Sequence, residues 1–192
     1  MNLNEILFNR FGRLRSGHRF AIFFFSFVLL SAVFVVGAVG ILANLPLGFS
    51  QGSLLAFVVP IAISAAISIF LGWFYGKIFE DLPFRALGIW LTRNWLKDLV
   101  WGSVTGALSV AFAAFIAFAI GGMRFEANPA AGGAAILLTL AVTLLIFTIG
   151  SISEEVLFRG YPFQTLARAG LVPVARILTS FLFASAHNAN PG

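Results

Sequence analysis

Long stretches without charge limit this sequence more than any other feature. No charged residue occurs from Phe20 to Gly76, and none occurs from Ala127 to Ser153. About 20 consecutive apolar residues are enough for a helix to cross a bilayer core, so the first run has room for two spans. In lipid, backbone polar groups need partners within the protein, and long apolar runs satisfy them as helices. The sequence therefore predicts an all-α, polytopic transmembrane helical bundle.

The composition supports an integral membrane protein and excludes a soluble domain. Hydrophobic residues make up 60% of the 192 residues and charged residues only 10%, against about 25% charged in soluble proteins. The net charge of +5 could indicate nucleic-acid binding. However, the basic residues are spread over short loops, so we predict no nucleic-acid partner. The absence of cysteine excludes disulfides and thiolate metal sites.

Polar and turn-forming segments divide the chain into about five spans with short interfacial helices. Residues 1–19 form a basic segment, expected as an amphipathic helix on an anionic membrane face or as a disordered basic tail. Residues 77–98 carry several tryptophans, which indicates a short helix at the membrane surface. We expect one transmembrane domain over residues 20–192. Its predicted spans are 20–43, 54–76, 99–123, 134–155 and 173–188.

The basic residues also predict an orientation. With a cytoplasmic start, the inside segments are 1–19, 77–98 and 154–176, and they hold eleven of the twelve Lys and Arg residues. Arg124 would then be the one basic residue outside. Because basic loops stay on the cytoplasmic side, this distribution predicts a cytoplasmic N-terminus.

Candidate catalytic groups are concentrated at the end of the fourth predicted span, in Glu154-Glu155-Val-Leu-Phe-Arg159. Ionisable groups inside a membrane are costly, so they usually have partners and a function. On a helix, Glu155 and Arg159 are four residues apart and pair, whereas Glu154 lies about 100° around the axis. Glu154 is then free to face the bundle and act as a general base toward water. Gly150, one turn earlier, leaves room for water or a peptide.

His187 is the second element of the predicted site, at the end of an apolar span. It could orient the same water or donate a hydrogen bond to a developing oxyanion. Asn190, three residues later, lies on roughly the same helix face and could assist. The structural alternatives are a helix end whose charges lie among headgroups and a neutral histidine bonded across helices. One histidine and one usable carboxylate are too few for catalytic zinc, so we predict no metal and no cofactor.

The depths of the two elements conflict if Arg176 marks the cytoplasmic boundary. His187 would then lie ~16 Å deep, whereas Glu154 would lie only ~7 Å above Arg159. The two side chains would meet if Arg176 sits a turn or more below the interface, or if Arg159 is drawn into the bilayer with its acidic partner.

Both motifs resemble those of a known family, the CPBP (CAAX protease and bacteriocin-processing) intramembrane proteases. Glu154-Glu155-x-x-x-Arg159 is similar to that family's Glu-Glu-x-x-x-Arg signature, and Phe183-x-x-x-His187 is similar to its second motif, Phe-x-x-x-His. The resemblance covers about residues 95–190 and implies a partial protease core over 99–192.

The resemblance implies a glutamate-dependent endopeptidase of a prokaryotic plasma membrane. Glu154 would activate water and His187 would be its partner. The supporting or substrate-contacting residues would be Glu155, Arg159, Phe183 and Asn190. The family includes enzymes that cleave prenylated CAAX proteins and others linked to bacteriocin processing. The implied partners are therefore the lipid bilayer and a peptide or lipidated protein substrate.

The family's third motif, a His followed four residues later by Asn or a similar residue, does not occur after His187. His18 lies in the N-terminal basic segment and cannot replace it. We therefore expect an incomplete version of the protease, and a second function stays open: a catalytically incomplete membrane protein acting as an immunity or scaffolding factor. A proton-coupled transporter that uses Glu154 and His187 is less favoured because the chain has no internal repeat.

Overall fold

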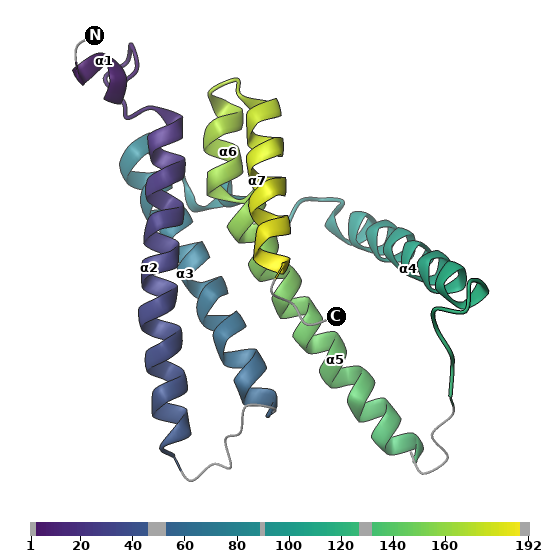
Figure 1. The fold of residues 1–192 in the computed structure, drawn as a ribbon. Coiled ribbons are helices and arrows are strands. Elements are labelled where there is room, and N and C mark those ends of the chain that lie inside the picture. Colours follow the sequence, from purple (N-terminus) through teal and green to yellow (C-terminus); the bar gives the residue numbers. More distant parts are fainter. Residues whose placement is uncertain (1–2, 46–52, 89–90, 127–131, 189–192) are drawn as a thin grey trace. The chain divides into compact units, whose positions relative to one another are not determined.

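A computed structural model of the chain describes residues 3–45, 53–88, 91–126 and 132–188, and its regular elements there are helices (Figure 1). The predicted all-α fold class is confirmed. In chain order the elements are α1 (Leu3–Leu7), α2 (Ser16–Ala43), α3 (Leu54–Glu80), the 3₁₀ helix η1 (Phe84–Leu87), α4 (Trp95–Ala119), α5 (Gly133–Glu154), the π-helix η2 (Glu155–Arg159), α6 (Tyr161–Arg168) and α7 (Val172–His187).

Four helical segments are long and apolar enough to cross a membrane, which makes this an integral membrane protein. They are α2, α3, α4 and Gly133–Arg168, the segment that joins α5, η2 and α6. The fifth predicted span, 173–188, is present as the shorter apolar helix α7 (Val172–His187, 16 residues). The prediction of about five spans is therefore confirmed as four long apolar helices and one shorter one.

The turn between α6 and α7 is formed around Gly170. Gly170 has a φ of +79°, a left-handed conformation that suits glycine at a helix C-terminus. The N–H of Gly170 donates to Ala167 O, and the N–H of Leu171 donates to Leu166 O, both at 3.0 Å. This bond pair caps α6 as a Schellman motif. Pro173 then lies in the first turn of α7, where its missing N–H has no cost.

The chain divides into two compact units, Met1–Trp90 with Val142–Gly192, and Leu91–Ala141. In the second unit, α4 has no buried residue within the described structure. A Cβ atom at Gly102 or Gly106 would meet nothing within 4 Å. Both glycines therefore have open space beside them among the described residues of this unit.

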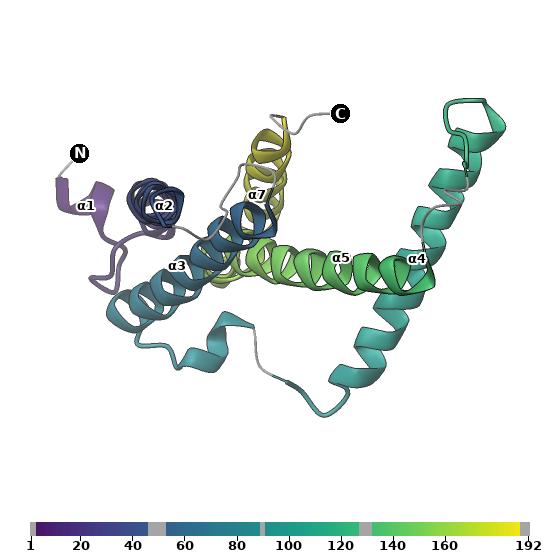
Figure 2. The same ribbon diagram turned by 90° about the horizontal axis from the view of Figure 1, so that it is seen from below.

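In the first unit α2 and α3 pack side by side, and α6 packs against both (Figure 2). The buried apolar core at their junction consists of Phe23, Ile67, Leu71, Leu87 and Tyr161. Its centre is the ring of Tyr161, which is 2% exposed. The core therefore fixes the start of α6, the helix that directly follows the acidic motif.

Gly72 and Gly76 on α3 make this packing possible. A Cβ at Gly72 would lie 2.8 Å from Leu87 Cδ2 and 3.4 Å from Tyr161 Cβ, and a Cβ at Gly76 would lie 3.7 Å from Tyr161 Cδ2. Small residues four positions apart let neighbouring elements approach closely in membranes. The two glycines therefore let Leu87 and Tyr161 pack against α3.

The N-terminal segment is neither the single amphipathic helix nor the disordered tail that the sequence suggested. Helix α1 ends at Leu7, and Phe8 and Leu14 form an antiparallel bridge. The side chain of Asn9 accepts two backbone N–H groups of the enclosed loop, at 2.9 and 3.0 Å. Gly12 supplies a φ of +70° for the turn. Residues 9–13 therefore form an Asx-type loop, and helix α1 does not continue through them.

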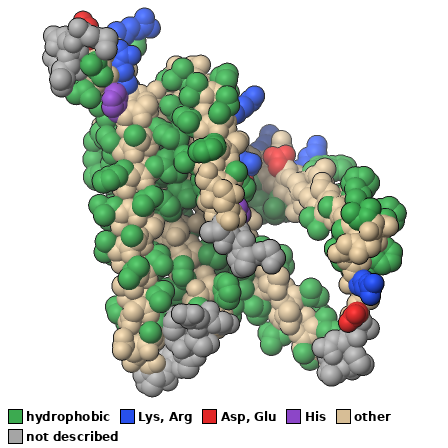
Figure 3. Space-filling model, viewed as in Figure 1, with side chains coloured by type: hydrophobic (Ala, Val, Ile, Leu, Met, Phe, Trp, Pro, Cys, Tyr) green, Lys and Arg blue, Asp and Glu red, His purple; other side chains and the backbone are tan. Residues whose placement is uncertain are grey.

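The outer surface of the first unit is apolar, as lipid contact requires. Hydrophobic side chains extend along α2, whereas Lys and Arg gather near its N-terminal end (Figure 3). Phe25 and Val36, for example, are 72% and 70% exposed. Soluble proteins rarely expose contiguous apolar surface of this kind.

Candidate active site

The acidic motif lies at a change of helix type. Helix α5 ends at Glu154, and Glu155–Arg159 form a π-helical turn before Gly160. Pro162 has no N–H to donate to the preceding turn, so a regular α-helical hydrogen-bond ladder cannot continue here. Residues 150–159 are thus helical, but the last turn is a π turn instead of an α-helical one. Single π turns within helices are frequent at functional sites.

Gly160 is the point where the chain turns from η2 into α6. Its N–H donates to Val156 O at 3.2 Å, and a Cβ at this position would lie only 2.3 Å from that same oxygen. Val156 is 2% exposed and Phe158 is 7% exposed, so the turn is held from its inner side. A residue without a side chain is therefore required at this junction.

Glu155 and Arg159 pair as the spacing predicted. Arg159 Nη1 lies 2.5 Å from Glu155 Oε1, and the two side chains are 73% and 55% exposed. Both carboxylate and guanidinium are thus engaged with each other on an open face of the turn. This leaves Glu154 as the acid of the pair with a different partner.

That partner is His187 on α7. His187 Nε2 lies 3.5 Å from Glu154 Oε1, and the side chains are 39% and 45% exposed. The two residues come from separate motifs more than thirty positions apart. Glu154 faces His187, the partner that the resemblance implied, and keeps an accessible face. Gly150 adds to that access, since a Cβ there would meet nothing within 4 Å.

The imidazole of His187 is held by its own helix. Nδ1 lies 2.8 Å from the carbonyl oxygen of Phe183. A carbonyl oxygen only accepts, so Nδ1 carries the proton of this bond and Nε2 is the nitrogen directed to Glu154. The Phe183 ring lies 4.3 Å from the imidazole and packs edge-on against Phe158 at 5.4 Å. Phe183 therefore positions the histidine through both its backbone and its ring.

The fold also explains how the two motifs reach the same depth. Helix α6 continues beyond Gly160 for eight residues, about 12 Å of helix, before α7 returns alongside it. Arg159 lies before the start of α6 and Arg168 lies at its end, so most of these ~12 Å separate the two arginines. Because α7 runs back alongside α6, His187 reaches the level of Glu154.

Residues 136–192 match the family model described as Type II CAAX prenyl endopeptidase Rce1-like. This segment contains both motifs and therefore every residue of the geometry just described. This match supports the resemblance to the CPBP/CAAX proteases for this part of the chain. No curated protein and no solved structure matches the chain.

Within the matched segment, the structure brings together Glu154 and His187, and separately Glu155 and Arg159. Phe183 lies against His187. The catalytic roles of these residues stay predictions. Asn190, the sixth predicted site residue, lies outside the described residues. Among the residues described, no group of three His, Asp or Glu side chains could hold a metal ion.

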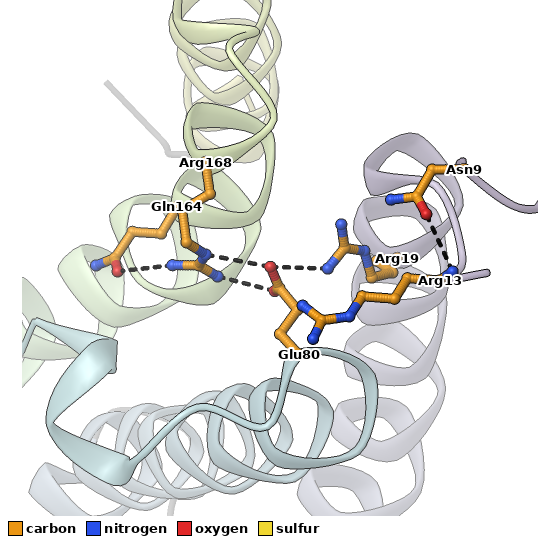
Figure 4. A network of polar contacts seen from close by, with 6 residues as sticks. All are labelled: Asn9, Arg13, Arg19, Glu80, Gln164 and Arg168. Carbon is orange, nitrogen blue, oxygen red and sulfur yellow. Dashed lines mark hydrogen bonds and ion pairs between the residues drawn. The ribbon is translucent and has the colours of Figure 1, made fainter. Parts of the chain in front are cut away.

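A second cluster, which the sequence analysis missed, lies partly outside the matched segment. Glu80 at the end of α3 accepts from Arg168 of α6 at 2.8 and 3.1 Å and lies 2.7 Å from Arg19 of α2 (Figure 4). The Glu80 and Arg19 side chains are 8% and 7% exposed. Gln164 accepts a further hydrogen bond from Arg168 at 3.4 Å. This cluster ties three helices together at one end of the first unit.

A signal for this cluster was present in the sequence. Arg19 is the last charged residue before the first uncharged run, and Lys77 and Glu80 follow that run directly. Two consecutive antiparallel spans bring such flanking residues to the same boundary. An acid and a base there would be expected to pair, because unpaired buried charges are costly.

Proposed function

We propose that this chain is an intramembrane endopeptidase in which Glu154 activates the water that cleaves a peptide bond. The observation that supports this most is the 3.5 Å approach of His187 Nε2 to Glu154 Oε1. Since Nδ1 of His187 is committed to a carbonyl oxygen, a single proton can be held between Nε2 and the carboxylate. Such a pair can accept a proton and return it during the reaction.

The proposed reaction has two steps and no covalent intermediate. Glu154 takes a proton from water while the water oxygen forms a bond to the peptide carbonyl carbon. Nε2–H of His187 donates to the oxyanion that develops on the carbonyl oxygen. The C–N bond then breaks as Glu154 returns its proton to the leaving nitrogen, which yields one carboxylic acid and one amine.

The proposed substrate is a peptide or a prenylated, CAAX-type protein. This choice rests on the family description, type II CAAX prenyl endopeptidase, for residues 136–192. We place the N-terminus and the acidic motif toward the cytoplasm because the basic loops flank them on that side. Glu155 and Arg159 would support the site, by keeping the second carboxylate engaged.

The experiment is proteolysis by the full chain reconstituted in liposomes, with prenylated and unprenylated fluorogenic peptides and product masses as readouts. We expect Glu154→Gln to lower kcat by about 10²–10⁴-fold, the usual contribution of a positioned base. Glu126→Gln, an exposed carboxylate outside the matched segment, is the control and should keep full activity. Retained activity in Glu154→Gln contradicts the proposal. A folded wild-type chain that cleaves neither peptide favours an immunity or scaffolding role.

A further inference from the structure

A large cavity lies where α2 begins and where α3 and α6 end. Its volume is about 1130 Å³, slightly above the range of about 300–1,000 Å³ typical of ligand pockets. Its walls come from the loop before α2, the first turns of α2, the end of α3 at Glu80 with the following Leu82, and the end of α6 at Arg168 with the turn after it. Neither Glu154 nor His187 lines it.

Positive charge dominates the cavity. Glu80 is its single lining carboxylate, and it is already engaged by two arginines. Arg10 and Arg13 have no carboxylate within ion-pair distance among the described residues, although Arg10 lies over the Phe11 ring at 4.8 Å. The five lining arginines are Arg10, Arg13, Arg15, Arg19 and Arg168.

Buried donors in the wall also lack partners. Arg19 Nε and His18 Nδ1 are shielded by the fold and form no hydrogen bond with any described residue. The Arg19 side chain is 7% exposed, and both residues line the cavity. Buried polar atoms are almost always satisfied in native proteins, so an unsatisfied guanidinium nitrogen here points to an acceptor that enters from the cavity.

We propose that this cavity binds a phosphate group, supplied by the headgroup of an anionic phospholipid. Guanidinium groups bind phosphate through paired, charge-assisted hydrogen bonds. The cavity also lies at a membrane boundary, since Arg19 directly precedes the uncharged run that starts at Phe20. Lipid phosphates are concentrated at that level, and basic residues near anionic leaflets attract them. Leu82 and Leu171 supply apolar wall for the adjoining glycerol and acyl carbons.

A substrate carboxylate is a poorer fit for the same cavity. The eight residues of α6, about 12 Å of helix, and the π turn separate Arg168 from Glu154. The three residues that follow the scissile bond of a CAAX-type peptide extend only about 10 Å. The lipid site therefore goes beyond the proposed peptidase function and does not depend on it.

The test uses the full chain purified in a neutral detergent. Native mass spectrometry counts retained lipid, and the melting temperature is followed during titration with short-chain phosphatidylglycerol, phosphatidylcholine or inorganic phosphate. We expect saturable stabilisation by phosphatidylglycerol. Arg13→Gln with Arg10→Gln should weaken its apparent affinity by at least tenfold, since charge-assisted bonds are lost. Arg93→Gln makes a matched charge change outside the cavity and should bind as the wild type does.

Each outcome decides the proposal. Equal stabilisation by phosphatidylcholine and phosphatidylglycerol overturns it, because both carry the phosphate and the net negative charge of the headgroup is then not recognised. Equal weakening by Arg93→Gln and by the Arg10 and Arg13 substitutions overturns it too, because bulk charge would explain the binding. Stabilisation by inorganic phosphate that matches phosphatidylglycerol supports a phosphate site but rejects the lipid as its source. Arg10 and Arg13 are chosen because they lie outside the Glu80 ion pairs, so their loss should leave the fold intact.

Discussion

Two glutamates of this chain meet basic partners in opposite surroundings. Glu80 is 8% exposed and is held by arginines from two other helices, whereas Glu154 is 45% exposed and faces a histidine at 3.5 Å. Both oxygens of Glu80 are engaged. Glu154 instead keeps an open side beside Gly150. A carboxylate with every acceptor engaged stabilises a fold, and one with a free acceptor is available to water or substrate.

The basic partners of the two glutamates also differ, because arginines hold Glu80 and a histidine faces Glu154. A guanidinium stays protonated and cannot exchange a proton with its acid, so the Glu80 cluster is fixed in charge. An imidazole can both accept and donate a proton, so we expect the Glu154 pair to exchange a proton during the proposed reaction. Substitutions at the two sites should therefore affect different measurements, stability at Glu80 and turnover at Glu154.

The largest stability effect is expected at Glu80. Glu80→Gln leaves Arg19 and Arg168 without their counter-charge in a closed environment, and such changes cost about 3–5 kcal/mol. Unfolding in mixed micelles by SDS titration measures this loss. Asp81→Asn is the matched control, because Asp81 pairs with Lys77 on the surface and that side chain is 79% exposed. A Glu80→Gln protein as stable as Asp81→Asn would show that the buried cluster contributes nothing.

The control at Asp81 also has a defined pH dependence. The hydrogen bond and charge of Lys77 hold the pKa of the Asp81 carboxyl below its ordinary value. A lowered folded-state pKa contributes stability above the unfolded-state pKa, and that contribution is lost as the pH falls through the folded-state value. Since the pair is open to solvent, any change in stability from this source should be small.

Gly160 lies between η2, next to Glu154, and α6, which ends at Arg168. Its substitution should have the next largest effect on stability. Gly160→Ala places a Cβ against Val156 O, and the shift of backbone needed to relieve the clash should cost about 1–3 kcal/mol. Turnover should fall with it, since η2 follows Glu154 directly. Gly150→Ala has open space in mid-helix and should instead gain up to about 1 kcal/mol. Equal melting temperatures for the two variants would contradict the close contact at Gly160.

The sequence predicted the regular elements of both regions well. The span expected over 54–76 is observed as Leu54–Glu80, and the fourth one as Gly133–Glu154 followed by η2. Apolar run length and capping residues determine such boundaries locally, as Gly170 shows for α6. The pairing of Glu155 with Arg159 also followed from local spacing alone.

The features that escaped prediction depend on contacts between distant segments. The partners of Glu80 come from α2 and α6. They could be predicted only if the arrangement of these helices around α3 were known, and the positions of charged residues in the sequence do not give that arrangement. The π turn after Glu154 likewise results from Pro162 together with the packing of the following helix. The contact between Glu154 and His187 could be predicted only from the resemblance, because the depths expected for the two residues from the sequence did not agree.

A smaller effect on stability is expected from substitution of Phe183, the residue that positions His187. Phe183→Leu removes the ring that lies against His187 and Phe158 and should cost about 1 kcal/mol of stability. The bond from Nδ1 to the backbone at this position remains, so the imidazole loosens without being lost. We expect kcat to fall about tenfold with little change in KM, and Phe183→Tyr to restore it. A change in KM alone would assign Phe183 to substrate binding instead.

The smallest effect tests whether Glu154 has water beside it. Glu155 and Arg159 form an ion pair on the open face of the same turn, with side chains 55% and 73% exposed. If that face meets water, Glu155→Gln should cost no more than about 1 kcal/mol, as for exposed pairs elsewhere. If it meets lipid, the unpaired guanidinium should cost about 2.5–3.5 kcal/mol. We expect the smaller value in SDS titration, because a hydrolytic Glu154 needs a hydrated turn; the larger value would remove the water on which the proposed reaction depends.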